Sequence, residues 1–339
     1  MLDLNTVWFL LVGVLIIGYA VLDGFDLGIG SLFYVLGKTD DEKKTLINSI
    51  APVWDGNEVW LLTGGGALFA AFPFVYATVF SGFYLAIMLV LFCLILRAVA
   101  VEYYFKAEED GLQPLMGKLF FLGSFIPALL FGVAVGNVVK GVPLDASSNY
   151  AGTFFALLNP YALLFGVIGL AAFLLQGSAY AIIKTQGDLQ SRAVKFARSL
   201  SLILLCLWIL GTIAGRLGSP HLFVNFTSYP ILYILPVLTL ASLSIIPAFL
   251  KKEYFHRVFI ASSAAIASMI LTLAAGAYPN LVIAHNPQLS LTIYNASSTP
   301  LTLKTMLIIA MIGVPIVLLY TGYVYYVFKG KAVPQRRGY

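Results

Sequence analysis

Long, nearly uninterrupted apolar segments recur along the whole chain, and they limit the possible folds more than any other feature. Of the 339 residues, 60% are hydrophobic and only 10% are charged. Each segment can cross about 30 Å of hydrocarbon as a helix that rises about 1.5 Å per residue. We therefore predict an all-α polytopic membrane protein with about nine transmembrane helices. The segments are Thr6–Leu36, Pro52–Phe72, Val75–Tyr104, Leu115–Val139, Asn159–Lys184, Phe196–Gly215, Tyr229–Leu250, Val258–Ala277 and Leu303–Phe328.

Lysine and arginine residues are distributed unequally between the alternate loops of this nine-span scheme. Seventeen of the 20 belong to one set of loops, and only Lys140, Arg216 and Lys304 belong to the other. This imbalance is the positive-inside pattern, so we expect the N-terminus outside and the C-terminus in the cytoplasm. The basic residues form no run or stripe. The net charge of +5 therefore follows from topology and does not indicate nucleic-acid binding.

The chain shows no internal repeat and no low-complexity linker, so we expect residues 1–339 to form a single transmembrane domain. Its two cysteines, Cys93 and Cys206, lie in apolar segments and do not indicate a disulfide framework. Aromatic residues gather near the ends of the spans, most densely between Tyr320 and Tyr326. Such a cluster is typical of an interfacial aromatic belt and requires no ligand.

Two pairs of acidic residues interrupt the first two apolar segments. Asp23 and Asp26 lie three residues apart, as do Asp55 and Glu58, so each pair falls on nearly one face of a helix. A charge inside a bilayer costs about 3 kcal/mol or more, which makes an intramembrane acid a functional hypothesis. All four carboxyls are expected at one depth near the cytoplasm, where they are candidates for a proton path. In the competing interpretation they only fix helix packing.

Other polar residues at similar depth have alternative roles. Arg97, at the end of the third segment, is a candidate counter-ion for one carboxylate or simply one more positive-inside residue. Trp54 and Trp60 flank the second acidic pair as interfacial anchors. Gln176 and Ser178 in the fifth segment are expected to form interhelical hydrogen bonds.

Glycines accompany the acidic pairs. Gly24, Gly28 and Gly30 would let a neighbouring helix approach the first segment closely. The run Gly64–Gly66 is not followed by Lys-Ser or Lys-Thr, so it does not match a phosphate-binding loop. We expect this run to mark close helix packing as well.

No residue pattern points to a redox or hydrolytic centre in this chain. His221, His256 and His285 all fall in predicted loops, and transmembrane haem proteins usually take axial ligands from their spans. There is no cysteine cluster and no nucleophile triad. We therefore expect neither catalytic residues nor a metal site here.

Several motifs together resemble subunit II of bacterial cytochrome bd-type quinol oxidases, and the resemblance covers essentially the whole chain. The most specific segment runs from Asn48 to Trp60 and contains Trp54-Asp55-Gly56-Asn57. The other matching segments are Asp23-Gly-Phe-Asp26, Gly64-Gly-Gly-Ala-Leu-Phe-Ala70, Phe131-Gly-Val-Ala-Val-Gly-Asn137, Gln176-Gly177 and Leu318-Leu-Tyr-Thr321.

The resemblance implies a fold of two four-helix bundles plus one peripheral helix, in the bacterial inner membrane. It implies a heterodimer with subunit I, often with a small single-span accessory subunit. Subunit I would carry two b-type haems, one d-type haem and the quinol site, and the complex would oxidise quinol and reduce O₂ to water. Subunit II would be haem-free and would help to bring cytoplasmic protons to the oxygen site. Whether this chain holds a quinone is left open.

Two other functions compete with this one. A proton-coupled secondary transporter often places polar groups in both of two repeats, but here the buried acids lie in one half of the chain and no repeat is found. A purely structural assembly partner, whose acids only fix packing, is compatible with the same sequence.

Overall fold

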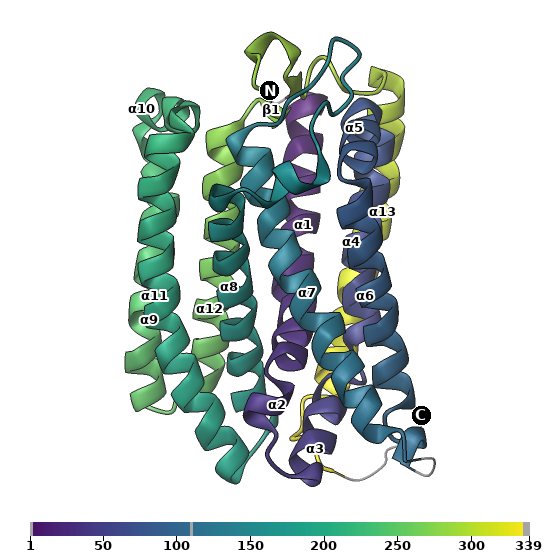
Figure 1. The fold of residues 1–339 in the computed structure, drawn as a ribbon, viewed down its shortest axis with the longest axis vertical. Helices are drawn as coiled ribbons and strands as arrows, with labels where there is room; N and C mark the ends of the chain where they lie inside the picture. The colour runs from purple at the N-terminus through teal and green to yellow at the C-terminus, as the bar shows by residue number, and fades with distance from the viewer. Residues whose placement is uncertain (1–2, 109–110, 335–339) are drawn as a thin grey trace.

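The computed structural model describes residues 3–108 and 111–334. Its long helices stand side by side; the first of them begins at one end of the bundle, and the last of them ends towards the other (Figure 1). We call these ends the N-terminal face and the opposite face. Within the described ranges, eight helices are long and apolar enough to cross a membrane. They are α1 (Leu4–Ser31), α6 (Tyr84–Tyr103), α7 (Gln113–Lys140), α8 (Pro160–Lys184), α9 (Gly187–Gly218), α11 (Ile234–Lys251, preceded by η4, Pro230–Tyr233), α12 (Phe255–Ala277) and α13 (Pro300–Val327).

The second predicted segment forms α4 (Trp54–Ala71), which contains both acids and the glycine run and so has no membrane-length stretch as apolar as those of the eight. Its 18 residues span about 27 Å, and it packs along α1 and α13. The predicted number of about nine helices therefore corresponds to eight strongly apolar helices and α4.

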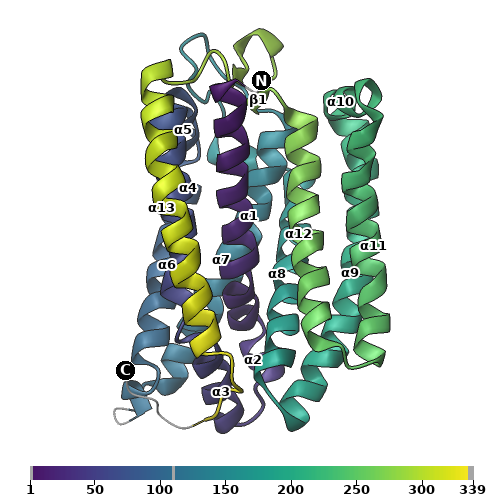
Figure 2. The ribbon, with the colours of Figure 1, turned by 180° about the vertical axis from the view of Figure 1, so that it is seen from behind.

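Two four-helix bundles share the molecule. α1, α4, α6 and α7 form the first bundle, and α8, α9, α11 and α12 form the second. α13 lies outside both and contacts α1 and α4 (Figures 1 and 2). This is the arrangement that the resemblance implied.

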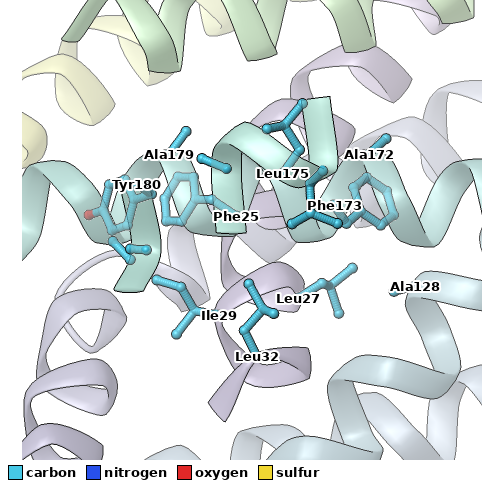
Figure 3. Close-up of a cluster of buried hydrophobic side chains, with 14 of the residues drawn as sticks. Phe25, Leu27, Ile29, Leu32, Ala128, Ala172, Phe173, Leu175, Ala179 and Tyr180 are labelled. Atoms are coloured by element: carbon cyan, nitrogen blue, oxygen red, sulfur yellow. The ribbon is translucent and has the colours of Figure 1, made fainter. Parts of the chain in front are cut away.

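α1 also joins the bundles, because it packs against α8 as well as against its own neighbours. A Cβ at Gly28 would lie 1.9 Å from the carbonyl oxygen of Phe173, and one at Gly177 would lie 2.4 Å from the carbonyl carbon of Gly28. The Phe25 ring stacks on Tyr180 with centroids 3.8 Å apart (Figure 3). The two backbones are thus in direct contact, as expected for Gly28.

The helix boundaries differ from the predicted segments in two places. The first segment breaks at Leu32 into α1 and α2 (Phe33–Leu36). The third segment consists of α5 (Pro73–Gly82) and α6, which meet at Phe83. The remaining short elements, at the two faces, are η1 (Lys106–Glu108), η2 (Phe154–Leu158), η3 (Pro220–Phe223), α10 (Val224–Ser228), η5 (Pro287–Leu289) and the antiparallel strands β1 (Asn280–Val282) and β2 (Leu291–Thr292).

A short amphipathic helix, α3 (Asp40–Ile50), closes the opposite face where a plain loop was expected. Thr39 and Glu42 form a capping box at its start, and Arg192 pairs with the Glu42 carboxylate. Partial burial works against the charge on Glu42. The hydrogen bonds from Arg192, Lys38 and Thr39 outweigh it and lower the pKa of this carboxyl.

Beyond α13, residues 328–333 cross the opposite face and bind the end of α8; we call them the C-terminal strap. The Lys184 ammonium donates to the carbonyls of Phe328 and Gly330, and the Ala332 amide donates to the Lys184 carbonyl at 2.8 Å. The Lys331 ammonium donates to the carbonyl of Thr185, also at 2.8 Å. Arg336 and Arg337, counted above among the cytoplasmic residues, lie outside the described residues.

Candidate functional site: a buried cluster of carboxyls

A buried arginine lies at the centre of the first bundle. Arg97 on α6 is 1% exposed. Its Nη1 donates to Asp23 Oδ2 at 3.1 Å, its Nη2 donates to Asp23 Oδ1 at 2.7 Å, and Nη2 also donates to Glu58. Two parallel N–H···O bonds to one carboxylate form the strong, bidentate type of ion pair. Three helices, α1, α4 and α6, thus meet in one charged group.

The second acid of α1, Asp26, has different partners. Its side chain is fully buried, and Asn57 Nδ2 donates to its Oδ2 at 2.8 Å. The Tyr325 hydroxyl of α13 donates to Asn57 Oδ1, also at 2.8 Å. Among the described residues, Asp26 Oδ1 has no hydrogen-bond partner. One oxygen of this carboxyl is therefore fixed, and the other is free.

Charge and exposure are both uneven across the cluster. Counted over the described residues, it contains three carboxyls, those of Asp23, Asp26 and Glu58, but one guanidinium, that of Arg97. Asp23 and Asp26 are fully buried, whereas the Glu58 side chain is 26% exposed. An unpaired buried charge costs several kcal/mol, so these groups are suited to holding and exchanging protons. Glu58 is the member of the cluster that reaches the surface.

Asp55 does not join the other three acids, contrary to our expectation of four carboxyls in one group. Its side chain is exposed, and one of its oxygens accepts a hydrogen bond from the Gly56 amide at 2.7 Å. Three residues turn a helix by about 300°, which leaves the two side chains about 60° apart. On α4 this angle directs Glu58 into the bundle and Asp55 out of it. The start of a helix also favours a carboxylate, which stabilises Asp55 where it lies.

The two tryptophans of the motif have different surroundings. Trp54 is buried in the core beside α3. Trp60 packs on α1 at Gly18, where a Cβ would lie 2.1 Å from the indole ring. Both therefore fill space between helices of this chain.

Gln176 joins α8 to two other helices, as expected. Its Nε2 donates to the Val21 carbonyl at 3.1 Å and to Ser263 Oγ at 2.9 Å, while Ser262 Oγ donates to its Oε1 at 2.5 Å. The same expectation was wrong for Ser178, whose hydroxyl donates to the Leu174 carbonyl of its own helix. A short hydroxyl side chain reaches the carbonyl one turn back more readily than a neighbouring helix.

The glycine run on α4 is not a site of close packing within this chain, contrary to our expectation. A Cβ at Gly65 or Gly66 would meet nothing within 4 Å, and one at Gly64 would touch only Leu15 at 3.7 Å. The outward face of α4 is a stripe of exposed residues spaced three or four apart. Its members are Asp55, Val59, Leu62, Gly66 and Phe69.

The histidines lie away from the cluster. The ring of His221 contacts the Val139 carbonyl at 3.0 Å, and His285 lies in the loop between β1 and η5. His256 falls in the first turn of α12 and not in a loop as predicted. In residues 3–108 and 111–334, no three His, Cys, Asp or Glu side chains are grouped to hold a metal ion. None of the three histidines lies in the middle of a membrane-spanning helix, where a transmembrane haem usually takes its axial ligands.

Tyr325 belongs to the site although its sequence context did not single it out. The cluster Tyr320–Tyr326 was expected to form an interfacial belt, which suits Tyr323 and Tyr326, each 66% exposed. Tyr325 instead turns inward. It lies 22 residues after the buried Leu303, which is close to six helical turns, so both belong to one face of α13. This spacing was the available signal.

Comparison with known proteins identifies the family. The sequence model of the protein family "Cytochrome bd terminal oxidase subunit II" matches residues 4–328 of this chain. The chain belongs to this family. This subunit II is 40% identical to cytochrome bd-I ubiquinol oxidase subunit 2 of Escherichia coli (strain K12), over 97% of this chain and 95% of that protein. It is 34% identical to cytochrome bd ubiquinol oxidase subunit 2 of Bacillus subtilis (strain 168), over 97% of each.

A solved structure shares the fold of this subunit II. A chain of the bd oxidase from Geobacillus thermodenitrificans matches with a TM-score of 0.81, covering 96% of this chain and 99% of that one, at 14% identity. The resemblance seen in the sequence motifs is therefore confirmed, and the chain is a multi-pass membrane subunit of a terminal oxidase complex.

Proposed function

We propose that this chain is the haem-free subunit II of a complex that oxidises quinol and reduces O₂ to water. In this proposal it forms a heterodimer with subunit I, which holds the two b-type haems, the d-type haem and the quinol site. A small single-span accessory subunit can join them. The complex lies in a bacterial inner membrane, with the opposite face of this chain in the cytoplasm. Residues 1–339 act as one transmembrane domain that supplies a docking surface and a cytoplasmic proton path.

The observation that supports the proton path is the buried cluster around Arg97. Asp23 and Glu58 accept hydrogen bonds from the same Nη2 atom, so their carboxyls are immediate neighbours. Asp26 lies one turn further along α1. With one guanidinium and three carboxyls, an electrically neutral cluster carries two protons. A proton taken up at the partly exposed Glu58 can therefore be matched by one released from a buried member.

The exposed stripe on α4 supports a docking surface. Lipid chains offer no hydrogen-bond donor to the Asp55 carboxyl, whereas a helix of another subunit can. The open glycines Gly65 and Gly66 would let such a helix approach closely. We place subunit I against this stripe. Asp55 then faces subunit I and is the acid of this chain that would pass protons across the contact.

The location of the charges argues against a secondary transporter. Asp23, Asp26, Glu58 and Arg97 all belong to the first bundle. In the second bundle, the contacts of Gln176 with Ser262 and Ser263 involve only uncharged groups. A proton-coupled transporter built from two repeats would be expected to place ionisable groups in both halves.

The proposal is tested on the purified complex. Glu58→Gln, Asp26→Asn and Asp55→Asn keep shape and hydrogen bonding but remove the proton exchange. Each should lower O₂ consumption per haem about tenfold or more with haem content unchanged, and Asp55→Glu should retain more activity than Asp55→Asn. The control is Asp188→Asn, at an exposed acid in the first turn of α9. If the Asn and Gln variants lose assembled complex but turn over normally per haem, the acids only fix packing and the proton path is wrong.

A further inference from the structure

We propose that Tyr325 is a positioning residue for the proton path, acting through Asn57 to hold the Asp26 carboxyl with Oδ1 open. The inference rests on the proposed function and assigns a role in it to the peripheral helix α13. It follows from the two hydrogen bonds that run from Tyr325 to Asn57 and from Asn57 to Asp26.

The amide of Asn57 has a defined direction. Its Oδ1 accepts from the Tyr325 hydroxyl and its Nδ2 donates to Asp26 Oδ2, with both donor–acceptor distances 2.8 Å. An amide oxygen can only accept, and a hydroxyl supplies the donor it needs. Nδ2 also donates to the Leu22 carbonyl at a longer 3.4 Å. Tyr325 therefore fixes the oxygen end of the amide, and the Leu22 carbonyl and Asp26 fix the nitrogen end. Without this hydroxyl, Oδ1 loses its donor, and the amide is held less firmly in the direction that presents Nδ2 to Asp26.

The direction of this amide determines how the Asp26 carboxyl is oriented and which of its oxygens is left without a hydrogen bond. With Nδ2 bound to Oδ2, the carboxyl cannot rotate freely, and its other oxygen, Oδ1, is buried and has no partner among the described residues. A proton on Oδ1 is held by no competing hydrogen bond. The arrangement thus presents one oxygen of Asp26 for proton exchange and anchors the other.

Contacts at both ends of α13 hold the helix in a position from which the Tyr325 hydroxyl reaches Asn57. Near the N-terminal face, the indole of Trp8 donates to the Leu303 carbonyl at 2.9 Å. At the other end, the C-terminal strap binds Lys184 immediately after the helix. Between these two points, the Tyr325 ring lies edge-on to Phe25 with centroids 6.5 Å apart. The hydroxyl therefore reaches Asn57 from a helix that is fixed at both ends.

The test is Tyr325→Phe in the purified complex, compared with Tyr326→Phe, which removes the same hydroxyl from an exposed ring one residue later. We expect Tyr325→Phe to lower O₂ consumption per haem about threefold to tenfold and to shift its pH profile, with haem content unchanged. The groups that set this profile around Asp26 are Asp23 on α1, Glu58 on α4, Arg97 on α6, Tyr180 on α8 and Tyr325 itself. Tyr326→Phe should behave like the unchanged complex.

A second measurement follows the carboxyl directly. The infrared C=O band of protonated Asp26, assigned by its loss in Asp26→Asn, should shift in Tyr325→Phe and not in Tyr326→Phe. If Asp26→Asn is impaired while Tyr325→Phe matches its control in turnover, pH profile and band position, this inference is wrong and the proton path stands. If Asp26→Asn turns over normally per haem, the proton path is wrong, and this inference is overturned with it.

Discussion

Removal of the Arg97 guanidinium should destabilise this subunit more than almost any other single change. Arg97 makes three N–H···O contacts with Asp23 and Glu58 and is 1% exposed. In Arg97→Gln both carboxyls lose their cation while Asp23 stays fully buried. Removing one partner of a buried pair costs about 3–5 kcal/mol, because the other charge is left uncompensated. Because about 1.4 kcal/mol corresponds to a tenfold change in an equilibrium constant, the equilibrium constant for folding should fall by about a hundredfold or more.

The assay is a double-mutant cycle on the unfolding free energy of the complex in mixed micelles. Arg97→Gln, Asp23→Asn and the double variant are compared with the exposed control Arg198→Gln, for which we expect a change within about 0.5 kcal/mol. If the cost comes from the uncompensated charge, the double variant should be more stable than Arg97→Gln alone. Arg97→Lys should recover only part of the loss, since an ammonium cannot make the bidentate contact.

Two results would refute this reasoning. In the first, Arg97→Gln is no less stable than Arg198→Gln, which would mean that the ion pair contributes nothing to folding. In the second, the double variant is as unstable as Arg97→Gln, which would assign the loss to packing of the long side chain and not to charge.

Three further predictions concern other parts of the molecule. Gly28→Ala should lower the unfolding free energy of the subunit by about 1–3 kcal/mol, because its Cβ would overlap the backbone of α8. Gly13→Ala on the same helix is the control, since its Cβ would meet nothing within 4 Å, and denaturant titrations of the two variants test the difference. The lowered pKa of Glu42 means that its pairing with Arg192 stabilises the fold at pH values above about 4.5, the ordinary pKa of the carboxyl, and that this contribution is lost as the pH falls through the lowered pKa of the folded state. In thermal unfolding, Glu42→Gln should cost at most about 1 kcal/mol at pH 7 and progressively less as the pH is lowered into the acid range. A cysteine at the exposed Ser147 should react with an impermeant thiol reagent from outside the cell, and labelling from the cytoplasm alone would contradict the proposed orientation.

The number and course of the long helices could be predicted because the bilayer fixes both their length and their apolar character. The same apolar character gives no signal for the points at which a segment is interrupted. Leu32 and Phe83 are as apolar as their neighbours, so hydropathy does not separate α1 from α2 or α5 from α6. α3 was missed for the opposite reason. It is too polar to be a span, and its signal was the capping box of Thr39 and Glu42.

The members of the site could be predicted better than their orientations. In a soluble protein, polar residues show which face of a helix points outward. Here both lipid and the bundle interior are apolar, so this signal is weak. Asp55 and Glu58 were therefore assigned to one face although the structure divides them, and Tyr325 was assigned to the lipid interface although it faces Asn57. Such rotations depend on the neighbouring helices, which a local pattern does not contain.

The two faces of α1 explain how carboxyls can be held at fixed positions inside a membrane. One face carries Asp23 and Asp26 towards α4 and α6, and another brings Gly28 against Gly177 of α8. The direct contact of the two backbones leaves α1 little freedom to rotate about its own axis. Such a rotation would separate Gly28 from Gly177 or remove Phe25 from its stack on Tyr180. The second bundle contributes no charge to the cluster. By fixing the rotation of α1, it determines where both aspartates lie relative to Arg97 and Asn57.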